Sequence, residues 1–161
     1  MSTPSIPRLT LEEHTGPALG FRFAVVFFAG GVVPNPIDIR FQRVSGIGAT
    51  VDTMTIAEGG QNLYSHRVPT RVGYGNLVLE RGLVVASPLN VEFNAAMSLF
   101  KFAPSNVIVT LLSEHRAPLA AWLFLKAYPV RWATADLDAS TESLVIDTLE
   151  LAYTRMQALR I

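Results

Sequence analysis

The stretch YGNLVLERGLVV, residues 74–85, alternates in the manner of a β-strand, yet it carries apolar residues on both faces and the pair Glu80-Arg81 at its centre. Successive side chains of a strand point to opposite faces of the sheet, and a strand with one exposed face shows one polar side. Residues 143–153 repeat the two-sided pattern. We therefore expect both faces of these strands to be covered, within the chain or by a neighbouring subunit.

The length of the chain fits one domain. It has 161 residues, of which 50% are apolar, enough to form a substantial core. The first 20 residues contain Pro4, Pro7 and Pro17, which predict an N-terminal arm at residues 1–20 and a single domain at residues 21–161. The start of the sequence lacks a basic segment followed by an apolar run, so we expect no secretory signal and folding in the cytoplasm. The longest apolar run is interrupted by Gly30 and Gly31, which argues against a transmembrane helix.

The charge composition argues against binding by bulk electrostatics. Thirteen basic residues balance thirteen acidic ones, which leaves no long-range field to attract nucleic acid or an anionic membrane. Charged residues make up 16% of the chain, against about 25% in ordinary soluble domains. A monomer with so little charge exposes apolar patches, and such patches usually contact other proteins. We therefore expect the chain to associate with itself.

The remaining pattern predicts a β-rich domain with one helix. Residues 21–28 are aromatic and β-branched and predict a buried strand, whereas residues 37–42 alternate strictly and predict a half-exposed one. Further strands are predicted in NVIVTLLS, PLAAWLFLKAYPVRWA and SLVIDTLELAYTRM.

The one predicted helix begins after Ser87, an N-cap residue, with Pro88 at its first position. We expect four apolar side chains on one face to pack it against the sheet: Leu89, Phe93, Met97 and Phe100.

Residues 46–71 predict a long, partly extended loop. Four glycines interrupt short extended pieces there: Gly46, Gly48, Gly59 and Gly60. Loops longer than about 15 residues in compact domains are usually functional or disordered, and we favour a functional one.

No group of residues predicts catalysis, a metal or a cofactor. His14, His66 and His115 lie in unrelated contexts without a second ligand at metal spacing. The absence of cysteine excludes disulfides and thiolate chemistry. The glycine-rich pieces lead into no helix and no lysine follows them, so they do not form a phosphate-binding loop. Trp122 and Trp132 have no basic patch around them, which favours a core or interface role over base stacking and predicts no specific nucleic-acid recognition.

Four segments resemble a known family, the inner tail tube proteins of contractile phages and of phage-derived contractile injection systems. They are FQRVSGIG at 41–48, HRVPTRVGYGNLVLERGL at 66–83, WLFLKAYPVRW at 122–132 and DLDASTESLVIDTLELAY at 136–153. In order and spacing they are similar to the family's VSG turn, its LP-to-RG strand, its W-x-F-x-x-A-x-P strand and its closing strand. The segments themselves lie between residues 41 and 153, and the resemblance as a whole is taken to cover residues 21–153, nearly the whole domain.

The resemblance implies a mainly β fold, a sandwich or barrel of two packed antiparallel sheets with one flanking helix. Six copies would form a ring whose sheets join into one barrel around a lumen, because joining sheets pairs the edge groups that a solitary sandwich exposes. Rings would stack into a hollow tube that a contracting sheath drives into a target, delivering cargo. The implied partners are the same chain, the sheath, the baseplate or spike hub and the tape-measure protein, in a phage tail or tail-like particle.

The same resemblance implies roles for particular residues. The 46–71 loop would contact the adjacent ring through Gly46, Gly48, Val51, Met54, Ile56, Gly59, Gly60 and Tyr64. The barrel strands would contribute Asn76, Val78, Glu80, Arg81, Asp147, Leu149 and Leu151.

The sequence departs from the family pattern in places. Val91 and Phe93 stand where a tryptophan is frequent, and Val68 replaces the leucine before Pro69. The N-terminal arm and the sequence of residues 59–77 are more similar to those of the minor, baseplate-proximal tube subunit. The alternatives are therefore a baseplate adaptor of the same fold that initiates the tube, or a stand-alone β-sandwich module that binds a small ligand or peptide.

Overall fold

The computed structural model describes residues 22–29, 33–35, 41–57, 59–60, 63–83, 87–140 and 143–160. The predicted arm at 1–20 and most of the strand expected at 37–42 lie outside these ranges. Along the chain the elements are β1 (Phe23–Ala29), β2 (Val33–Asn35), β3 (Arg43–Ser45), β4 (Ala49–Ile56), β5 (His66–Tyr74), β6 (Leu77–Gly82), α1 (Pro88–Leu99), β7 (Ser105–Leu112), β8 (Pro118–Thr134), β9 (Ile146–Ala152) and β10 (Arg155–Arg160). The mainly β fold with one helix is confirmed for the described residues.

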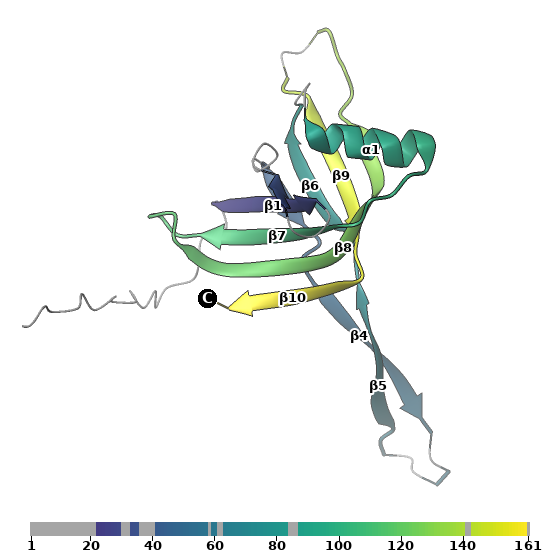
Figure 1. Ribbon diagram of the computed structural model, residues 1–161. Coiled ribbons are helices and arrows are strands. Elements are labelled where there is room, and N and C mark those ends of the chain that lie inside the picture. The colour runs from purple at the N-terminus through teal and green to yellow at the C-terminus, as the bar shows by residue number, and fades with distance from the viewer. Residues whose placement is uncertain are drawn as a thin grey trace, which may run out of the picture.

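One long strand, β8, joins the two halves of the body (Figure 1). Its residues 118–127 pair with β7 and β10, in a first sheet ordered β2-β1-β7-β8-β10. Its residues 128–134 pair with β9, in a second sheet ordered β3-β6-β9-β8. All the pairings are antiparallel.

The passage of β8 between the sheets has a local cause. Lys126 has a positive φ of 52°, and the pairing with β7 shifts register next to it. The pairing with β9 shifts again after Pro129, which has no main-chain N–H to donate. Such bulges bend a strand and raise its twist. The two shifts therefore allow one strand to belong to both sheets.

The core lies between the two sheets and beneath the helix. Along β6 and β9 every second side chain is buried, and Leu79 lies opposite Leu149 while Leu77 lies opposite Leu151. In the first sheet Val25 lies opposite Val109 and Phe27 opposite Val107. Beneath the helix the core is completed by Leu89, Phe93, Phe124 and Ala127. The inward face of the opening stretch is therefore covered within the chain.

Helix α1 buries a narrower face than predicted. Ser87 occupies the N-cap and Pro88 begins the helix, and the buried side chains are Leu89, Phe93 and Ala96. The prediction is wrong for Met97, which is 45% exposed, and for Phe100, which is 85% exposed. Met97 lies at the margin of the buried stripe, about 40° around the helix axis from Phe93. Phe100 has a φ of 52° and ends the helix, so its side chain leaves the stripe.

The prediction of a long loop at residues 46–71 is also wrong. The chain forms a two-stranded antiparallel hairpin of β4 and β5, which projects from the body as an arm (Figure 1). Its strands are rich in Thr, Val and Ile, residues that favour extended structure. The alternation is weak because both faces of the arm are exposed in the single chain and no one side is apolar.

Candidate functional site

The hairpin arm exposes nearly all the side chains of its two strands. Strand β4 follows β3 and strand β5 precedes β6, and β3 and β6 pair with each other within the second sheet. The arm is therefore the outer part of one long hairpin whose base is anchored in the body. All of β4 and most of β5 are exposed.

The arm leaves the body at a glycine. Gly46 has a φ of +83°, a conformation that side chains rarely adopt, and a Cβ at this position would overlap the carbonyl oxygen of Asn76. Gly48, two residues further, has nothing near its missing side chain. The two segments that approach each other at the base of the arm therefore require glycine at position 46 but not at position 48.

A bulge divides the arm into two halves with apolar groups on opposite faces. Asp52 pairs with Arg71 and Thr53 with Pro69, so Thr70 is the extra residue, and its hydroxyl donates to the carbonyl of Asp52 at 3.0 Å. Val68 and Val72 are four residues apart and would share a face in a regular strand. Because of the bulge they lie on opposite faces.

Near the body, Val51 pairs with Val72 on one face. Beyond the bulge, Met54 pairs with Val68 and Ile56 with His66 on the other face, which we call the Met54 face. Val51 is 56% exposed and Met54 is 54% exposed. The arm therefore presents two separate apolar surfaces to two different directions.

Cross-strand hydrogen bonds hold the arm in one geometry. The guanidinium of Arg67 donates to the hydroxyl of Thr53 at 2.9 Å, and the hydroxyl of Thr50 donates to the carbonyl of Gly73 at 3.3 Å. Near the tip the ring of Tyr64 packs edge-on against His66, with centroids 5.3 Å apart. The eight residues predicted for the inter-ring loop thus lie on this arm, at its base or at its tip.

The residues predicted for the barrel strands divide between two faces of the second sheet. Leu149 and Leu151 face the core, together with Arg81 and Asp147, and all four are buried. Val78 and Glu80 lie on the opposite face, and Asn76 is exposed at the end of β6. Of the predicted set, only these last three are available to a partner or a lumen.

The outward face of the second sheet carries two ion pairs among apolar and small side chains such as Val78, Ala133 and Ile146. Arg131 contacts Glu150 at 3.3 Å, and the amide of Asn76 donates to the same carboxylate at 3.4 Å. Arg43 lies 3.8 Å from Glu80. Sequence reasoning missed Arg43, Arg131 and Glu150, although the alternation of Glu150 with Leu149 and Leu151 was a usable signal.

The buried Arg81 ties the helix to the second sheet. Its guanidinium donates to the hydroxyl of Ser87 at 3.1 Å and to the amide oxygen of Asn90 at 2.6 Å, and it lies over the ring of Phe41. Opposite it in the sheet, Asp147 accepts a hydrogen bond from the hydroxyl of Thr134 at 2.8 Å. This arrangement positions the start of α1 against the second sheet.

An aromatic group lies where the arm meets the body. The ring of Tyr153 contacts Phe124 and Tyr74, with centroids 4.8 and 5.5 Å apart. Burial, with a smaller contribution from Tyr74, raises the pKa of the Tyr153 phenol above its ordinary value of 10.0. The phenol therefore stays neutral over the ordinary pH range.

The described residues contain no group of three His, Cys, Asp or Glu side chains able to hold a metal ion. Within the same part of the chain, no helix has the length and apolar character needed to cross a bilayer.

The sequence profile of the T4-like virus tail tube protein gp19 family matches residues 19–157 of this chain. The chain therefore belongs to that tail tube family. None of the curated proteins compared with it matches.

One solved structure supports the assignment, and two more distant ones share the fold. A chain in the anti-feeding prophage baseplate, symmetrised six-fold, is 40% identical with a TM-score of 0.83, covering 91% of this chain and 97% of that one. A chain in the PVC sheath-tube complex, an extracellular contractile injection system, is 20% identical with a TM-score of 0.76, covering 99% and 100%. A chain in the cap that terminates the anti-feeding prophage tube is also 20% identical, with a TM-score of 0.75 and coverage of 91% and 93%. The family resemblance expected from the four segments is confirmed.

Proposed function

We propose that this chain is a structural subunit of the inner tube of a contractile injection system, placed in a ring at or near the baseplate. The observation that carries the proposal is the 40% identity to a chain of the anti-feeding prophage baseplate, against 20% to the chain of the PVC sheath-tube complex. Six copies would form the ring, as the six-fold symmetry of that baseplate suggests by analogy. Further rings would continue the tube.

The ends of the sheets suit joining between subunits. Among the described residues, the second sheet ends at β3 on one side and at residues 128–134 of β8 on the other, and the first sheet ends at β2 and β10. Unpaired main-chain N–H and C=O groups on such edges are available for pairing with another chain. Joining the second sheets of six copies edge to edge would close a barrel and leave no exposed edge in that sheet.

The outward face of the second sheet suits the wall of a lumen. Its carboxylates at Glu80 and Glu150 are matched by Arg43 and Arg131, so these four charges balance. A wall whose charges balance exerts little net field on a charged cargo. The hairpin arm would contact the adjacent ring, with the sheath, the spike hub, the tape-measure protein and the cargo as further partners.

In this proposal the chain makes and breaks no bond. It would assemble in the cytoplasm and act as part of a phage tail or tail-like particle. Its role is mechanical, because a rigid tube transmits the force of sheath contraction.

Negative-stain imaging of the purified full chain, with its mass measured in solution, tests the proposal. Six-fold rings or stacked rings are expected. A monomer at all concentrations would overturn it and favour the stand-alone binding module. Counting copies per particle distinguishes a position in the baseplate ring from one in the tube wall. A baseplate ring would hold one set of six copies, and the tube wall many sets.

A further inference from the structure

Most of the exposed large apolar side chains of the described residues fall into two sets, and Leu83, Val91, Leu137 and Leu144 lie outside both. One set lies on the hairpin arm: Val51, Met54, Ile56, Leu63, Tyr64, Val68 and Val72. Another lies around the C-terminal end of α1 and the adjoining part of β8: Met97, Leu99, Phe100, Phe102, Tyr128 and Val130. Apolar groups gathered in this way mark contacts with other proteins.

Three rings of the second set form an ordered surface feature, which we call the aromatic cluster. Phe100 packs edge-on against Phe102 with centroids 5.0 Å apart, and Phe102 packs edge-on against Tyr128 at 5.8 Å. All three side chains are exposed. The cluster is therefore held in place by its own contacts while its outer ring surfaces face solvent.

The backbone at Phe100 argues that the ring serves a purpose outside the single chain. Its φ of 52° lies in the left-handed region, which is unfavourable for a bulky side chain. Glycine is the residue that best ends a helix in this conformation. The Phe100 ring is 85% exposed, so the single chain gains little from it in return.

The Met54 face of the arm is chemically complementary to the aromatic cluster. It carries Met54, Ile56 and Val68, and a methionine thioether packs well against aromatic rings. Arg71, opposite Asp52, lies on the same face, and a guanidinium stacks favourably on an aromatic ring. Both surfaces are exposed in the single chain, so each has apolar area to cover.

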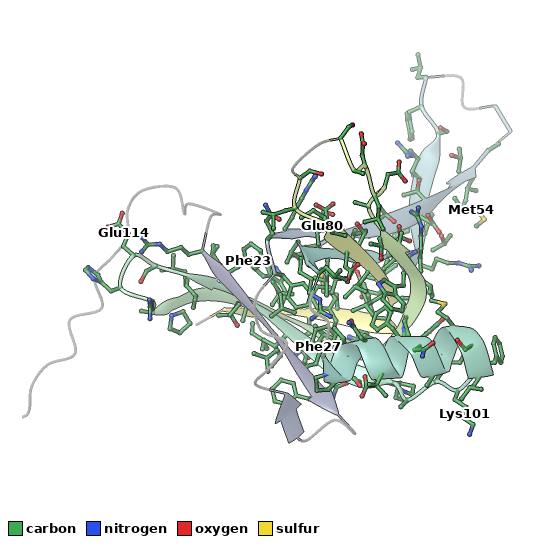
Figure 2. All side chains as sticks on the ribbon, turned by 90° about the horizontal axis from the view of Figure 1, so that it is seen from above. Phe23, Phe27, Met54, Glu80, Lys101 and Glu114 are labelled. Carbon is green, nitrogen blue, oxygen red and sulfur yellow. The ribbon has the colours of Figure 1, made fainter. Side chains whose placement is uncertain are left out.

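The two surfaces lie too far apart to meet within one molecule. In both views the arm and the C-terminal end of α1 project from different parts of the body, and Figure 2 labels Met54 on the arm and Lys101, the residue after Phe100, at the helix end (Figures 1 and 2). Two different patches that complement each other make a head-to-tail contact, which repeats from copy to copy.

We propose that the aromatic cluster is the surface on which the Met54 face of the arm of a second copy of this chain docks. The proposal rests on the proposed function, because it requires copies placed end to end. It names the receiving surface for the arm.

Cross-linking through introduced thiols tests the contact, since the chain has no cysteine of its own. The double variant Met54→Cys/Phe100→Cys, treated with a short bismaleimide during assembly, should give a ladder of covalent oligomers on a denaturing gel. The matched control is Val51→Cys/Phe100→Cys, whose arm position is equally exposed but lies on the opposite face. That control should give at least tenfold less product.

Each result decides the proposal. A ladder specific to the Met54 pair supports it. If rings or stacks form normally but the Met54 pair cross-links no more than the Val51 control, or not at all, the proposed docking surface is wrong. The proposed function is unaffected by that result. A chain that remains monomeric overturns both.

The variant Phe100→Gly provides a second test that does not depend on thiols. Glycine suits the left-handed backbone, so the melting temperature should be unchanged or higher. Loss of the ring should raise the protein concentration needed for half-maximal stacking about tenfold. Leu144→Gly, a substitution of an exposed side chain in the 135–145 connection, is the control. Unchanged stacking by Phe100→Gly would overturn the proposal.

Discussion

The missing side chain of Gly46 leaves the space that the carbonyl oxygen of Asn76 occupies. The two residues lie where the long hairpin passes from the second sheet into the arm, and the positive φ of Gly46 turns the chain at that point. The direction of the arm therefore depends on one close main-chain approach that no other residue permits.

The first prediction concerns this approach. Gly46→Ala should lower the free energy of unfolding by about 1–3 kcal/mol, because alanine must both take up a left-handed backbone and displace Asn76. Gly48→Ala, with open space around it, should change it by less than about 0.5 kcal/mol. Urea unfolding of both variants measures the difference, and equal midpoints would show that the Gly46 approach is not under constraint.

The second prediction concerns Arg81. Arg81→Met should destabilise the fold by about 2–5 kcal/mol, because Ser87, Asn90 and the facing Asp147 lose a buried cation. Arg43→Met is the control, since its ion pair with Glu80 is exposed and contributes about 1 kcal/mol at most. Thermal and urea unfolding compare the two. A loss for Arg81→Met no larger than that for Arg43→Met would contradict the assigned role.

The third prediction distinguishes the two faces of the opening stretch. Leu79 is fully buried, so Leu79→Asp places an unpaired carboxylate in the core and should leave no folded protein. Val78, its neighbour on the outward face, should tolerate Val78→Thr with a loss below about 1 kcal/mol. Circular dichroism and melting curves report both. Soluble, cooperatively folded Leu79→Asp protein would mean that this side chain faces outward.

The fourth prediction separates folding from stacking. Replacing residues 50–73 by Asn-Gly would join the paired residues Ala49 and Tyr74 through a tight hairpin turn. No residue of the removed segment belongs to the core cluster, so the variant should fold with a melting temperature within a few degrees of the parent. It should form single rings that do not stack.

Electron micrographs and sedimentation check the stacking half of this prediction. Tubes of normal length from the shortened chain would remove the arm from the inter-ring contact. An unfolded variant would instead show that the arm contributes to the stability of the body.

Several features could be predicted from the sequence because they depend on local order. The two-sided apolar pattern at residues 74–85 predicted a strand covered on both faces. The inner cover lies within the chain, where Leu77 and Leu79 are buried, whereas Val78 and Glu80 on the other face are only partly buried in the single chain. Ser87 and Pro88 marked the start of the one helix. Four short segments in order were sufficient for the family, which the profile match over residues 19–157 confirms.

Other features depended on the tertiary structure, because they arise where two distant segments meet. The sequence of the arm predicts a loop, because neither of its faces is buried in the single chain and the apolar pattern is weak. Only the pairing of β4 with β5 defines the hairpin. The bulge at Thr70 places Val68 and Val72 on opposite faces, although their spacing alone would put them together. The left-handed end of α1 exposes Phe100, which helical periodicity would bury.

The amino-acid sequence by itself therefore determined the fold class, the family and the inward face of the strands, because alternation and turn residues act over a few neighbours. Only the tertiary structure decided which apolar side chains remain uncovered and in which directions they point. That outcome depends on bulges, caps and close main-chain approaches, whose effect on a surface appears once the distant strands are paired.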